Sequence, residues 1–583
     1  MANDADQEAK LSYQVDENPP LRLTVGIGFQ FALLSLSAVM LIPAVAFRAG
    51  GMEESTTVWA VFATMIICGA VMVLHARPIG RFGSGYVTAL CPPTAAIAVT
   101  ADALAFGGLT LLAALTFTAA VVQFAFALRI SLLRRLLTPT VSGTALMLIP
   151  VTVFPVIFGM FDDLPASHSN AVAPVCAGVA ILVIGGINLK GGANLRSWAP
   201  LLAIFTGSCV ALYFDAYDTQ RIVNAAWVGI PTGWPTNFNA GTPAIDFESF
   251  LALAPAFVLL FLICSIRAMS SSLAIQSVSW RNQRTMDFRP VQGTLAADAA
   301  SNVAAGLVGT MPNCANSGSV ARIQLTGVAS RTVGVFYGIG IVLLAFCPKV
   351  VALILAVPAP VYAGYVTVML ATTFTVGLKM AVSERVDQRQ GMIIGLAFWI
   401  GAGCQYGFIF PEFVASFAGG MFNNALTTGG LIAILLSAVL VATSSRRDRF
   451  ESSLSISSLS VMREFVSDLT SRHEWSTKLS ERIDAIIEES IHTLLRNDQE
   501  ATVSDRRLLL VVHRESNAVE LEFIAAGGHE NIEDRLAVLG ETATEESIER
   551  DVSLRLLRHL ADDVRHRQYY DVDILTVRVD GTS

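Results

Sequence analysis

The sequence predicts an α-helical polytopic membrane protein with an α+β domain at its C-terminal end. Of its 583 residues, 53% are hydrophobic and only 15% are charged, and the mean hydropathy is +0.57. Several uncharged runs reach the roughly 20 residues that an α-helix needs to cross a bilayer. After residue 444 the composition becomes polar and Ser-rich. A chain this apolar is not a soluble protein, so most of it is expected to lie in lipid.

Apolar runs without charge recur through the first part of the chain. They lie at residues 23–47, 55–74, 103–128, 136–161, 169–189 and 350–378. The first run is too long for a cleaved signal peptide and follows many acidic and polar residues, so we expect it to be the first span, behind an N-terminal tail of residues 1–21. With interrupted helices included, we expect about fourteen spans within residues 22–444.

Basic residues predict the orientation of these spans. The loops after even-numbered spans carry Arg77, Arg81, Arg129, Arg134, Arg135, Lys190, Arg196, Arg281, Arg284, Arg289, Arg331, Lys379, Arg385 and Arg389. The opposite loops carry only Arg48, Arg221 and Lys349. Because cytoplasmic loops are enriched in Lys and Arg, we expect both termini to be cytoplasmic and the protein to lie in the inner membrane.

Two predicted spans are interrupted by glycine and proline. They read "GSGYVTALCPPTA" (83–95) and "GTMPNCANSGS" (309–319) and take third and tenth place among the spans. Such a pair at corresponding positions is typical of an inverted-repeat transporter whose broken helices line the substrate cavity. The alternative is two ordinary kinked helices.

The composition also disfavours other classes of function. The eight cysteines are scattered singly and no histidines cluster, so neither a disulfide nor a metal site is expected. The net charge of −8 gives no footprint for nucleic acid. The chain has no Gly-x-x-x-x-Gly-Lys loop, which disfavours an ATP-driven pump. We expect no cofactor and no enzymatic activity, and the expected partners are a lipid bilayer and a small-molecule substrate.

Several motifs resemble the nucleobase–ascorbate transporters, also called xanthine/uracil permeases. They are "LTPTVSGTALMLI", "ADAASNVAAGLVGTMPN", "LTGVASR", "VYAGYVTVMLATTFTVGLKM", "VDQRQGMIIGLAFWIGAG" and "ALTTGGLIAILL", in the family's order between residues 22 and 444. The resemblance implies a permease of nucleobase-type substrates that works by an elevator mechanism, with proton or sodium as coupling ion. It also implies a seven-plus-seven inverted repeat, a core domain of helices one to four and eight to eleven, a gate domain of the rest, and a homodimer.

The chain departs from this family at the positions that hold the base. The family's helix-eight glutamate corresponds to Arg267, and its helix-ten acceptor falls at or beside Gly318, between Ser317 and Ser319. The family's helix-one Gln-His pair reads Gln30-Phe31. An arginine donates hydrogen bonds and accepts none, so an anionic substrate is expected: a urate-like purine, or else a small carboxylate or inorganic anion. The alternative is a structural arginine, capped by carbonyls or paired with Asp298.

Further candidate residues lie on the broken spans and next to Arg267. The binding candidates are Tyr86, Thr88, Ala89, Ser271, Asn313, Cys314 and Asn316. Phe31 would either stack on a planar ring or serve only in packing. Asp298 is the candidate for the coupling ion, carrying a proton or binding sodium, with neutralisation of Arg267 as the alternative.

After the spans we expect a linker at 445–460 and a cytoplasmic domain at 461–583. Its ending resembles the last helix and strand of histidine-kinase-like ATPases of the anti-sigma-factor kinase type. Thr493 stands where the family's magnesium-binding Asn would follow Glu489, and no Asp-x-Gly box is visible in "AAGGHENIEDRL". A degenerate regulatory or dimerising domain with a cytoplasmic partner is therefore expected. Two functions stay open, a transporter with a regulatory tail and a membrane sensor that signals through this domain.

Overall fold

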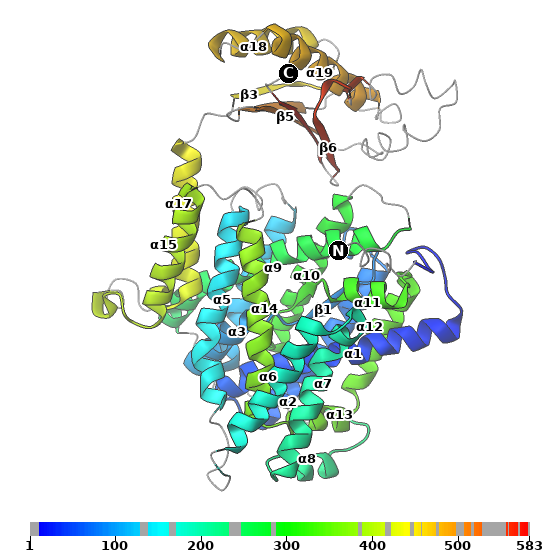
Figure 1. The fold of residues 1–583 in the computed structure, drawn as a ribbon, viewed down its shortest axis with the longest axis vertical. Helices are drawn as coiled ribbons and strands as arrows, with labels where there is room; N and C mark the ends of the chain where they lie inside the picture. The colour runs from blue at the N-terminus through cyan, green and yellow to red at the C-terminus, as the bar shows by residue number, and fades with distance from the viewer. Residues whose placement is uncertain are drawn as a thin grey trace. The chain divides into compact units, whose positions relative to one another are not determined.

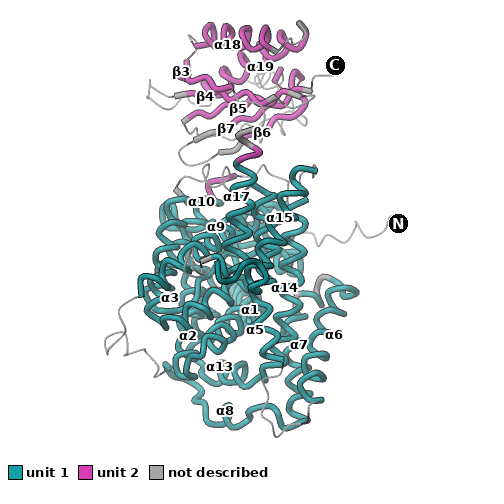
Figure 2. The backbone as a smooth tube through the Cα atoms, turned by 90° about the vertical axis from the view of Figure 1, so that its left-hand side faces the viewer, with its two compact units in different colours: residues 1–281, 290–438 teal, residues 282–289, 439–583 magenta. Residues whose placement is uncertain are grey.

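The computed structural model describes most of the chain as two compact units. The described residues are 11–128, 138–161, 169, 171–231, 246–281, 287–382, 388–413, 421–443, 448–455, 458–473, 477–496, 507–514, 518–526, 556–557, 559–568 and 572–580. The first unit contains residues 1–281 and 290–438, and the second contains residues 282–289 and 439–583 (Figure 2). The first unit is almost entirely helical (Figure 1).

The helices of the first unit follow one another with short connections. They are α1 (Leu21–Ala49), α2 (Glu54–Ala76), α3 (Ala96–Leu128), α5 (Pro139–Phe161), α6 (Val172–Lys190), α7 (Ala193–Tyr213), α8 (Thr219–Asn224), α9 (Phe247–Val278), α10 (Phe288–Val308), α11 (Gly318–Thr326), α12 (Arg331–Ala345), α13 (Pro348–Leu355), α14 (Ala359–Ala381), α15 (Gln388–Gln405) and α17 (Ala425–Thr443), with a 3-10 turn η2 (Met421–Asn423). Two short strands, β1 (Ala89–Cys91) and β2 (Cys314–Asn316), interrupt this order.

The described helices reproduce the predicted order of spans. Seven are long and apolar enough to cross a membrane, namely α1, α2, α3, α5, α6, α9 and α14. Within α3, Gly108 has a left-handed φ of 64°, so α3 is two helices joined at a kink. In chain order, α1, α2, β1 with the first part of α3, the second part of α3, α5, α6 and α7 make seven elements. The elements α9, α10, β2 with α11, α12, α14, α15 and α17 make seven more, which confirms the predicted fold class.

The helices pack in two groups that correspond to the expected core and gate. In the core group α1 and α2 pack on α12, and α3 packs on α9, whereas in the gate group α14 packs on α5, α6 and α7. Glycines allow the closest contacts in both groups. A Cβ on Gly69 of α2 would lie 2.7 Å from the carbonyl oxygen of Gly338, and one on Gly377 of α14 would lie 2.8 Å from that of Gly143. Backbones that approach this closely leave no room for a side chain.

The two interrupted spans meet each other inside the first unit. Strands β1 and β2 pair antiparallel, with Ala89 opposite Asn316, Leu90 opposite Ala315 and Cys91 opposite Cys314. Each strand is followed by a helix, α3 after β1 and α11 after β2. The alternative of two ordinary kinked helices is therefore wrong, because backbone that leaves helical geometry here finds its hydrogen bonds in the opposite broken span.

The expected N-terminal tail, residues 1–21, is partly an ordered element. Residues 12–17, which we call the N-terminal clip, form a parallel bridge between Tyr13 and Val328, and the Arg331 amide donates to the carbonyl of Val15. Arg281 donates to both carboxylate oxygens of Glu17, at 2.8 and 2.7 Å. The clip thus joins the end of α9 to the connection between α11 and α12, and the description of this segment as a free tail is corrected.

The second unit contains a five-stranded antiparallel sheet and two long helices. The strands are β3 (Asp448–Ser453), β4 (Arg507–Arg514), β5 (Ala518–Ala526), β6 (Asp563–Gln568) and β7 (Val572–Asp580), in the order β3-β4-β5-β7-β6. The helices are α18 (Ser458–His473) and α19 (Thr477–Arg496), and apolar residues of both form one core with alternate residues of the strands. The predicted helix and three predicted strands are present as α19, β4, β5 and β7.

The predicted linker at 445–460 is wrong over much of its length. Residues 448–453 are the edge strand β3, and α18 begins at Ser458. Phe450 packs against Phe465 with ring centroids 5.2 Å apart, which anchors the strand on the core of the second unit. The serines concealed this alternation, because one partly buried phenylalanine in a short polar stretch is a weak strand signal.

Candidate functional site

The exposed edge of β2 is held by two side chains of α10. Asp298 Oδ2 accepts a hydrogen bond from the backbone N of Ala315 at 2.9 Å, and Asn302 Oδ1 accepts one from the backbone N of Asn313 at 2.7 Å. The two side chains lie one turn apart on α10, and the two amides lie two residues apart on the segment that contains β2. Helix and strand periodicities therefore coincide here, and β2 is fixed on one edge by α10 and on the other by β1.

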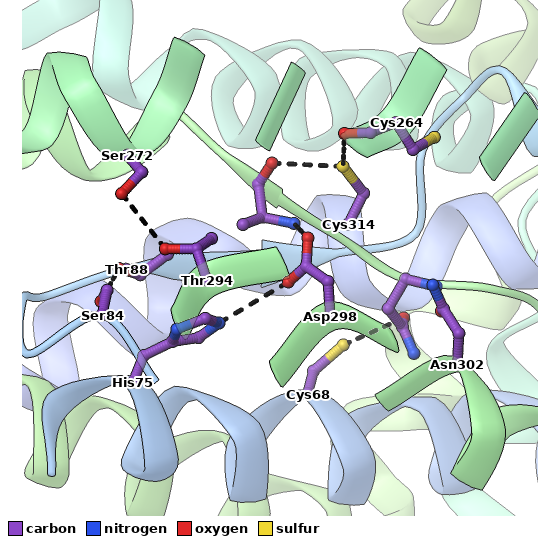
Figure 3. Close-up of polar contacts among 12 residues, drawn as sticks. Cys68, His75, Ser84, Thr88, Cys264, Ser272, Thr294, Asp298, Asn302 and Cys314 are labelled. Carbon is purple, nitrogen blue, oxygen red and sulfur yellow. Dashed lines mark hydrogen bonds and ion pairs between the residues drawn. The ribbon is translucent and has the colours of Figure 1, made fainter. Parts of the chain in front are cut away.

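Asp298 lies at the centre of this framework. Its Oδ1 is 3.6 Å from Nε2 of His75 on α2, and both side chains are completely buried (Figure 3). Arg267 and Asp298 are both described, and no ion pair joins them. The alternative in which Asp298 neutralises Arg267 is therefore not what this structure shows. An ionisable pair buried within a membrane unit is costly and marks a functional position.

A chain of hydrogen bonds links Asn302 to the helices around it. Its Nδ2 donates to Gln123 Oε1 on α3 at 2.9 Å, and Gln123 Nε2 donates to Ser265 Oγ on α9 at 3.1 Å. On the other side, Cys68 Sγ on α2 donates to Asn313 Oδ1 at 3.2 Å. Four elements of the core group are thus joined to β2 through buried polar side chains, which makes the crossing rigid.

Arg267 lies beside the crossing of the two strands. It is on α9 and partly exposed, and its charge acts on the thiols of Cys91 at the end of β1 and Cys314 at the start of β2. No hydrogen bond or ion pair of Arg267 is found with any other described residue. The alternative of an arginine capped by carbonyls thus has no support among the described residues.

The other predicted residues of the tenth span have different surroundings. Asn316 donates through Nδ2 to Cys91 Sγ at 3.0 Å and accepts the Gly318 amide at 2.8 Å, which fixes the start of α11. Ser317 is exposed at the N-cap position, whereas Ser319 is completely buried and its hydroxyl has no partner among the described residues. Nδ2 of Asn313 is likewise buried without a partner in the described part of the chain. The structure thus leaves one hydroxyl and one amide beside β2 for a further partner.

The predicted residues on the third span bond largely to their own surroundings. Tyr86 Oη accepts a hydrogen bond from Trp280 Nε1 at 3.3 Å, so this hydroxyl is directed toward the end of α9. Thr88 shares a 2.8 Å hydrogen bond with Ser84, and Ala89 begins β1. On this span only the backbone of β1 lies at the crossing itself.

The remaining candidates lie on α1 and α9. Gln30 is partly exposed, whereas Phe31 is completely buried and meets Tyr337 edge-on with ring centroids 6.0 Å apart. A ring enclosed in this way favours packing over stacking on a substrate. Ser271 is buried one helical turn after Arg267, on the same face of α9.

Sequence reasoning missed two charged or ionisable residues at the site. His75 is a single histidine in an apolar span, and nothing in its surroundings along the chain indicates a partner on α10. Arg322 lies on α11, where Nη1 donates to Tyr337 Oη at 2.8 Å. The signal for Arg322 was available, because a cation inside an interrupted span is unusual.

The arrangement provides a binding site for an anion. The N-termini of α3 and α11 follow the two strands, and a helix N-terminus carries partial positive charge. Arg267 adds a full charge, and the carboxylate of Asp298 is already engaged by His75 and the Ala315 amide. Among the described residues, no group of three or more His, Cys, Asp or Glu could hold a metal ion.

Comparison with known proteins places the chain in a family. The permease family model for xanthine and uracil permeases matches residues 22–410. The xanthine permease XanP of Escherichia coli is 24% identical over 449 residues, covering 74% of this chain and 95% of XanP. The uric acid permease PucK of Bacillus subtilis is 23% identical over 421 residues, covering 71% and 94%. Among solved structures, the transmembrane domain of the cyanobacterium bicarbonate transporter BicA aligns with a TM-score of 0.43 at 14% identity, covering 73% of this chain and 100% of that one. The chain belongs to the xanthine/uracil permease family, within the nucleobase–ascorbate transporters.

Proposed function

We propose that the protein is a secondary active transporter of a nucleobase-type substrate that is anionic at neutral pH, such as urate or a xanthine-like purine. Its family membership and its likeness to XanP and PucK, named for xanthine and uric acid, support the nucleobase class. The observation that supports an anion is Arg267, which lies beside the two broken spans without a hydrogen bond or ion pair to any described residue.

The chemistry of the guanidinium selects the charge of the substrate. It offers five N–H donors in a planar fork and no acceptor, so it suits carboxylates, deprotonated imides and ring carbonyls. A neutral base that presents N–H groups would leave the donors of Arg267 facing other donors. A small carboxylate or inorganic anion would satisfy the same arginine without a ring, and it is the second candidate.

The placement of the site supports an elevator-type mechanism. All candidate residues lie on α1, β1, α9, α10, β2 and α11, which belong to the core group, and none lies on α5, α6, α7 or α14 of the gate group. The hydrogen bonds of Asp298 and Asn302 join β2 to this group alone. A substrate held by these residues would move with the core as one body, past a gate that contributes no ligand.

The positions of basic residues support the expected orientation. Arg48 and Arg221, from loops assigned to the same side, both donate to the carbonyl of Leu355, at 2.7 and 2.6 Å. Lys349, also assigned to that side, donates to the carbonyl of Ala225 next to α8 at 3.3 Å. We take this to be the side away from the cytoplasm, with both termini cytoplasmic, in the inner membrane. The family also leads us to propose a homodimer, and proton or sodium as coupling ion.

For the second unit we propose a degenerate histidine-kinase-like ATPase domain that binds a regulatory partner and no nucleotide. The support is its sheet with α18 and α19 packed on it, and Thr493 at the position of the expected magnesium ligand. Thr493 is buried on α19. Most of the "AAGGHENIEDRL" stretch, which lacks an Asp-x-Gly box, lies outside the described residues.

Binding to the purified full-length protein tests the proposed substrate class. The probes are urate, xanthine, uracil and oxalate, and the variants are Arg267→Ala, Arg267→Lys and Arg267→Glu. Because a charge-assisted hydrogen bond contributes about 1.5–3 kcal/mol, Arg267→Ala should weaken urate binding at least roughly tenfold. Arg267→Lys should retain part of the affinity, and Arg267→Glu should favour neutral xanthine or uracil. Arg196→Ala, which removes an exposed arginine of α7, is the control.

The outcomes separate the candidates. Tight oxalate binding without urate binding would indicate the small-anion transporter. Parent-like affinity in all three variants would overturn the assignment of Arg267 to the site. Uptake of the bound probe into proteoliposomes then separates a transporter from a sensor, because a sensor binds without accumulating its ligand.

A further inference from the structure

A second guanidinium lies at the crossing of the broken spans. Arg322 lies on α11, four residues after the first residue of that helix, and is partly exposed. Its Nη1 donates to Tyr337 Oη at 2.8 Å, and its guanidinium carbon is 5.4 Å from the centre of the Tyr337 ring. Tyr337 is completely buried on α12 and its hydroxyl also bonds to Ser35 of α1. Arg322 is therefore directed back toward the interior of the core group.

The space in front of Arg322 exists because residue 318 is glycine. A Cβ on Gly318 would lie 3.6 Å from Arg322 Nη2 and 2.7 Å from Asn316 Oδ1. This is the position at which the family resemblance placed the helix-ten acceptor side chain. The place of an acceptor is therefore adjoined by donors of a guanidinium.

Arg322 and Arg267 approach the same point from two helices. The charges of both act on the thiol of Cys91, at the end of β1. Neither guanidinium forms an ion pair with a described carboxylate. Two like charges close to one point in a membrane protein repel each other and lack compensation, and a bound anion would supply it.

The two arginines are prepared for binding to different degrees. Tyr337 takes one of the five N–H donors of Arg322 and supports its charge from the ring face, so the remaining donors are oriented before a ligand arrives. Arg267 has no comparable support among the described residues. A ligand would thus meet one fixed guanidinium and one that is free to adjust.

We propose that Arg322 is a second substrate-binding and specificity-determining residue, and that it forms with Arg267 a two-arginine clamp for a planar anion with acceptor atoms on two edges. This inference rests on the proposed function and narrows its substrate class. A purine anion that carries carbonyl or deprotonated ring nitrogen acceptors on both its rings fits the clamp, and a neutral pyrimidine such as uracil does not. Tyr337 is a positioning residue that acts through Arg322.

Binding of urate, uracil and oxalate to full-length variants tests the clamp. Arg322→Ala should weaken urate binding about 10- to 100-fold and change uracil binding little. Arg322→Lys should keep part of the urate affinity, and Arg322→Gln, which retains donors without charge, should lose most of it. These two variants decide the question if Arg322→Ala is not monodisperse. The control is Arg196→Ala on α7.

A double-mutant cycle tests the role of Tyr337. Tyr337→Phe keeps the ring and removes the hydroxyl, so urate binding should weaken by about 3- to 10-fold in the parent. In the Arg322→Ala background the same change should have no effect, because the group that it positions is gone. A purely structural tyrosine would give the same loss in both backgrounds.

The failures are distinguishable. If Arg267→Ala weakens urate binding while all three Arg322 variants bind urate like the parent, the clamp is wrong and the anionic substrate stands. If the parent itself binds uracil in preference to urate and oxalate, the proposed function is wrong and the clamp fails with it. If oxalate loses as much affinity as urate in Arg322→Ala, the clamp recognises small anions instead of purine edges, which overturns the purine assignment.

Discussion

Replacement of Asp298 separates its structural role from its proposed role in coupling. The carboxylate accepts the Ala315 amide at 2.9 Å and lies 3.6 Å from His75, and Ala315 is completely buried. In Asp298→Asn the amide oxygen still accepts the Ala315 N–H, but the group no longer ionises. In Asp298→Ala the buried N–H of Ala315 loses its partner altogether.

The hydrogen-bond energies give the expected order of stability. A charge-assisted bond contributes about 1.5–3 kcal/mol and a neutral one about 0.5–1.5 kcal/mol, so Asp298→Asn should cost roughly 1 kcal/mol. An unpaired buried amide costs about 1–3 kcal/mol in addition to the lost bond, so Asp298→Ala should cost roughly 2–4 kcal/mol and disturb β2. Thermal melting of the purified variants measures this difference.

Transport in proteoliposomes then tests coupling. Asp298→Asn should retain exchange of radiolabelled urate between internal and external pools, and it should lose accumulation driven by a proton or sodium gradient. Asn302→Ala is the matched control, because Asn302 caps the Asn313 amide one turn away at 2.7 Å without carrying charge. It should lower exchange and accumulation in proportion. Accumulation at the parent level in Asp298→Asn would refute the coupling role, and equal melting of the Asn and Ala variants would refute the hydrogen-bond argument.

Two further predictions concern the second unit. Truncation after Thr443 should leave a monodisperse membrane unit with unchanged urate affinity, because all of β3 is removed with the sheet to which it belongs, and loss of binding would show that the tail supports the site. His566 is buried on β6, and burial lowers its pKa from 6.5 to about 4. Since the unfolded chain then binds the proton first, stability is retained above pH 6.5 and lost as the pH falls toward 4, by about 2 kcal/mol at pH 5. Urea unfolding of residues 446–583, whose core is self-contained, should show this loss, and a His566→Gln variant with the same pH dependence would contradict it.

The order of the membrane elements could be read from the sequence because lipid imposes it. A span needs a long apolar run, and irregular backbone at depth needs a cavity, so 83–95 and 309–319 stood out as interrupted. Their pairing as β1 and β2 follows from the same requirement, since a broken helix must satisfy its amides elsewhere.

The partners of the ionisable residues could not be read in the same way. Asp298 was singled out, but its contact with His75 joins residues 223 positions apart (298 − 75) on helices whose rotation is set by packing. Arg322 was overlooked because attention fell on the departure at Gly318, four residues earlier. In the second unit, β3 was taken as a linker because its single phenylalanine contact forms only after the sheet is assembled.

The N-terminal clip has a practical consequence for measuring motion. It is bonded to the end of α9 through Glu17 and Arg281, and to Val328 and Arg331 beyond α11, all within the group that holds the candidate site. A fluorophore attached near Tyr13 would therefore report the position of the substrate-bearing half, whereas one on the exposed face of α6 would report the stationary half. The change in energy transfer between the two labels during turnover would measure the length of the transport stroke directly.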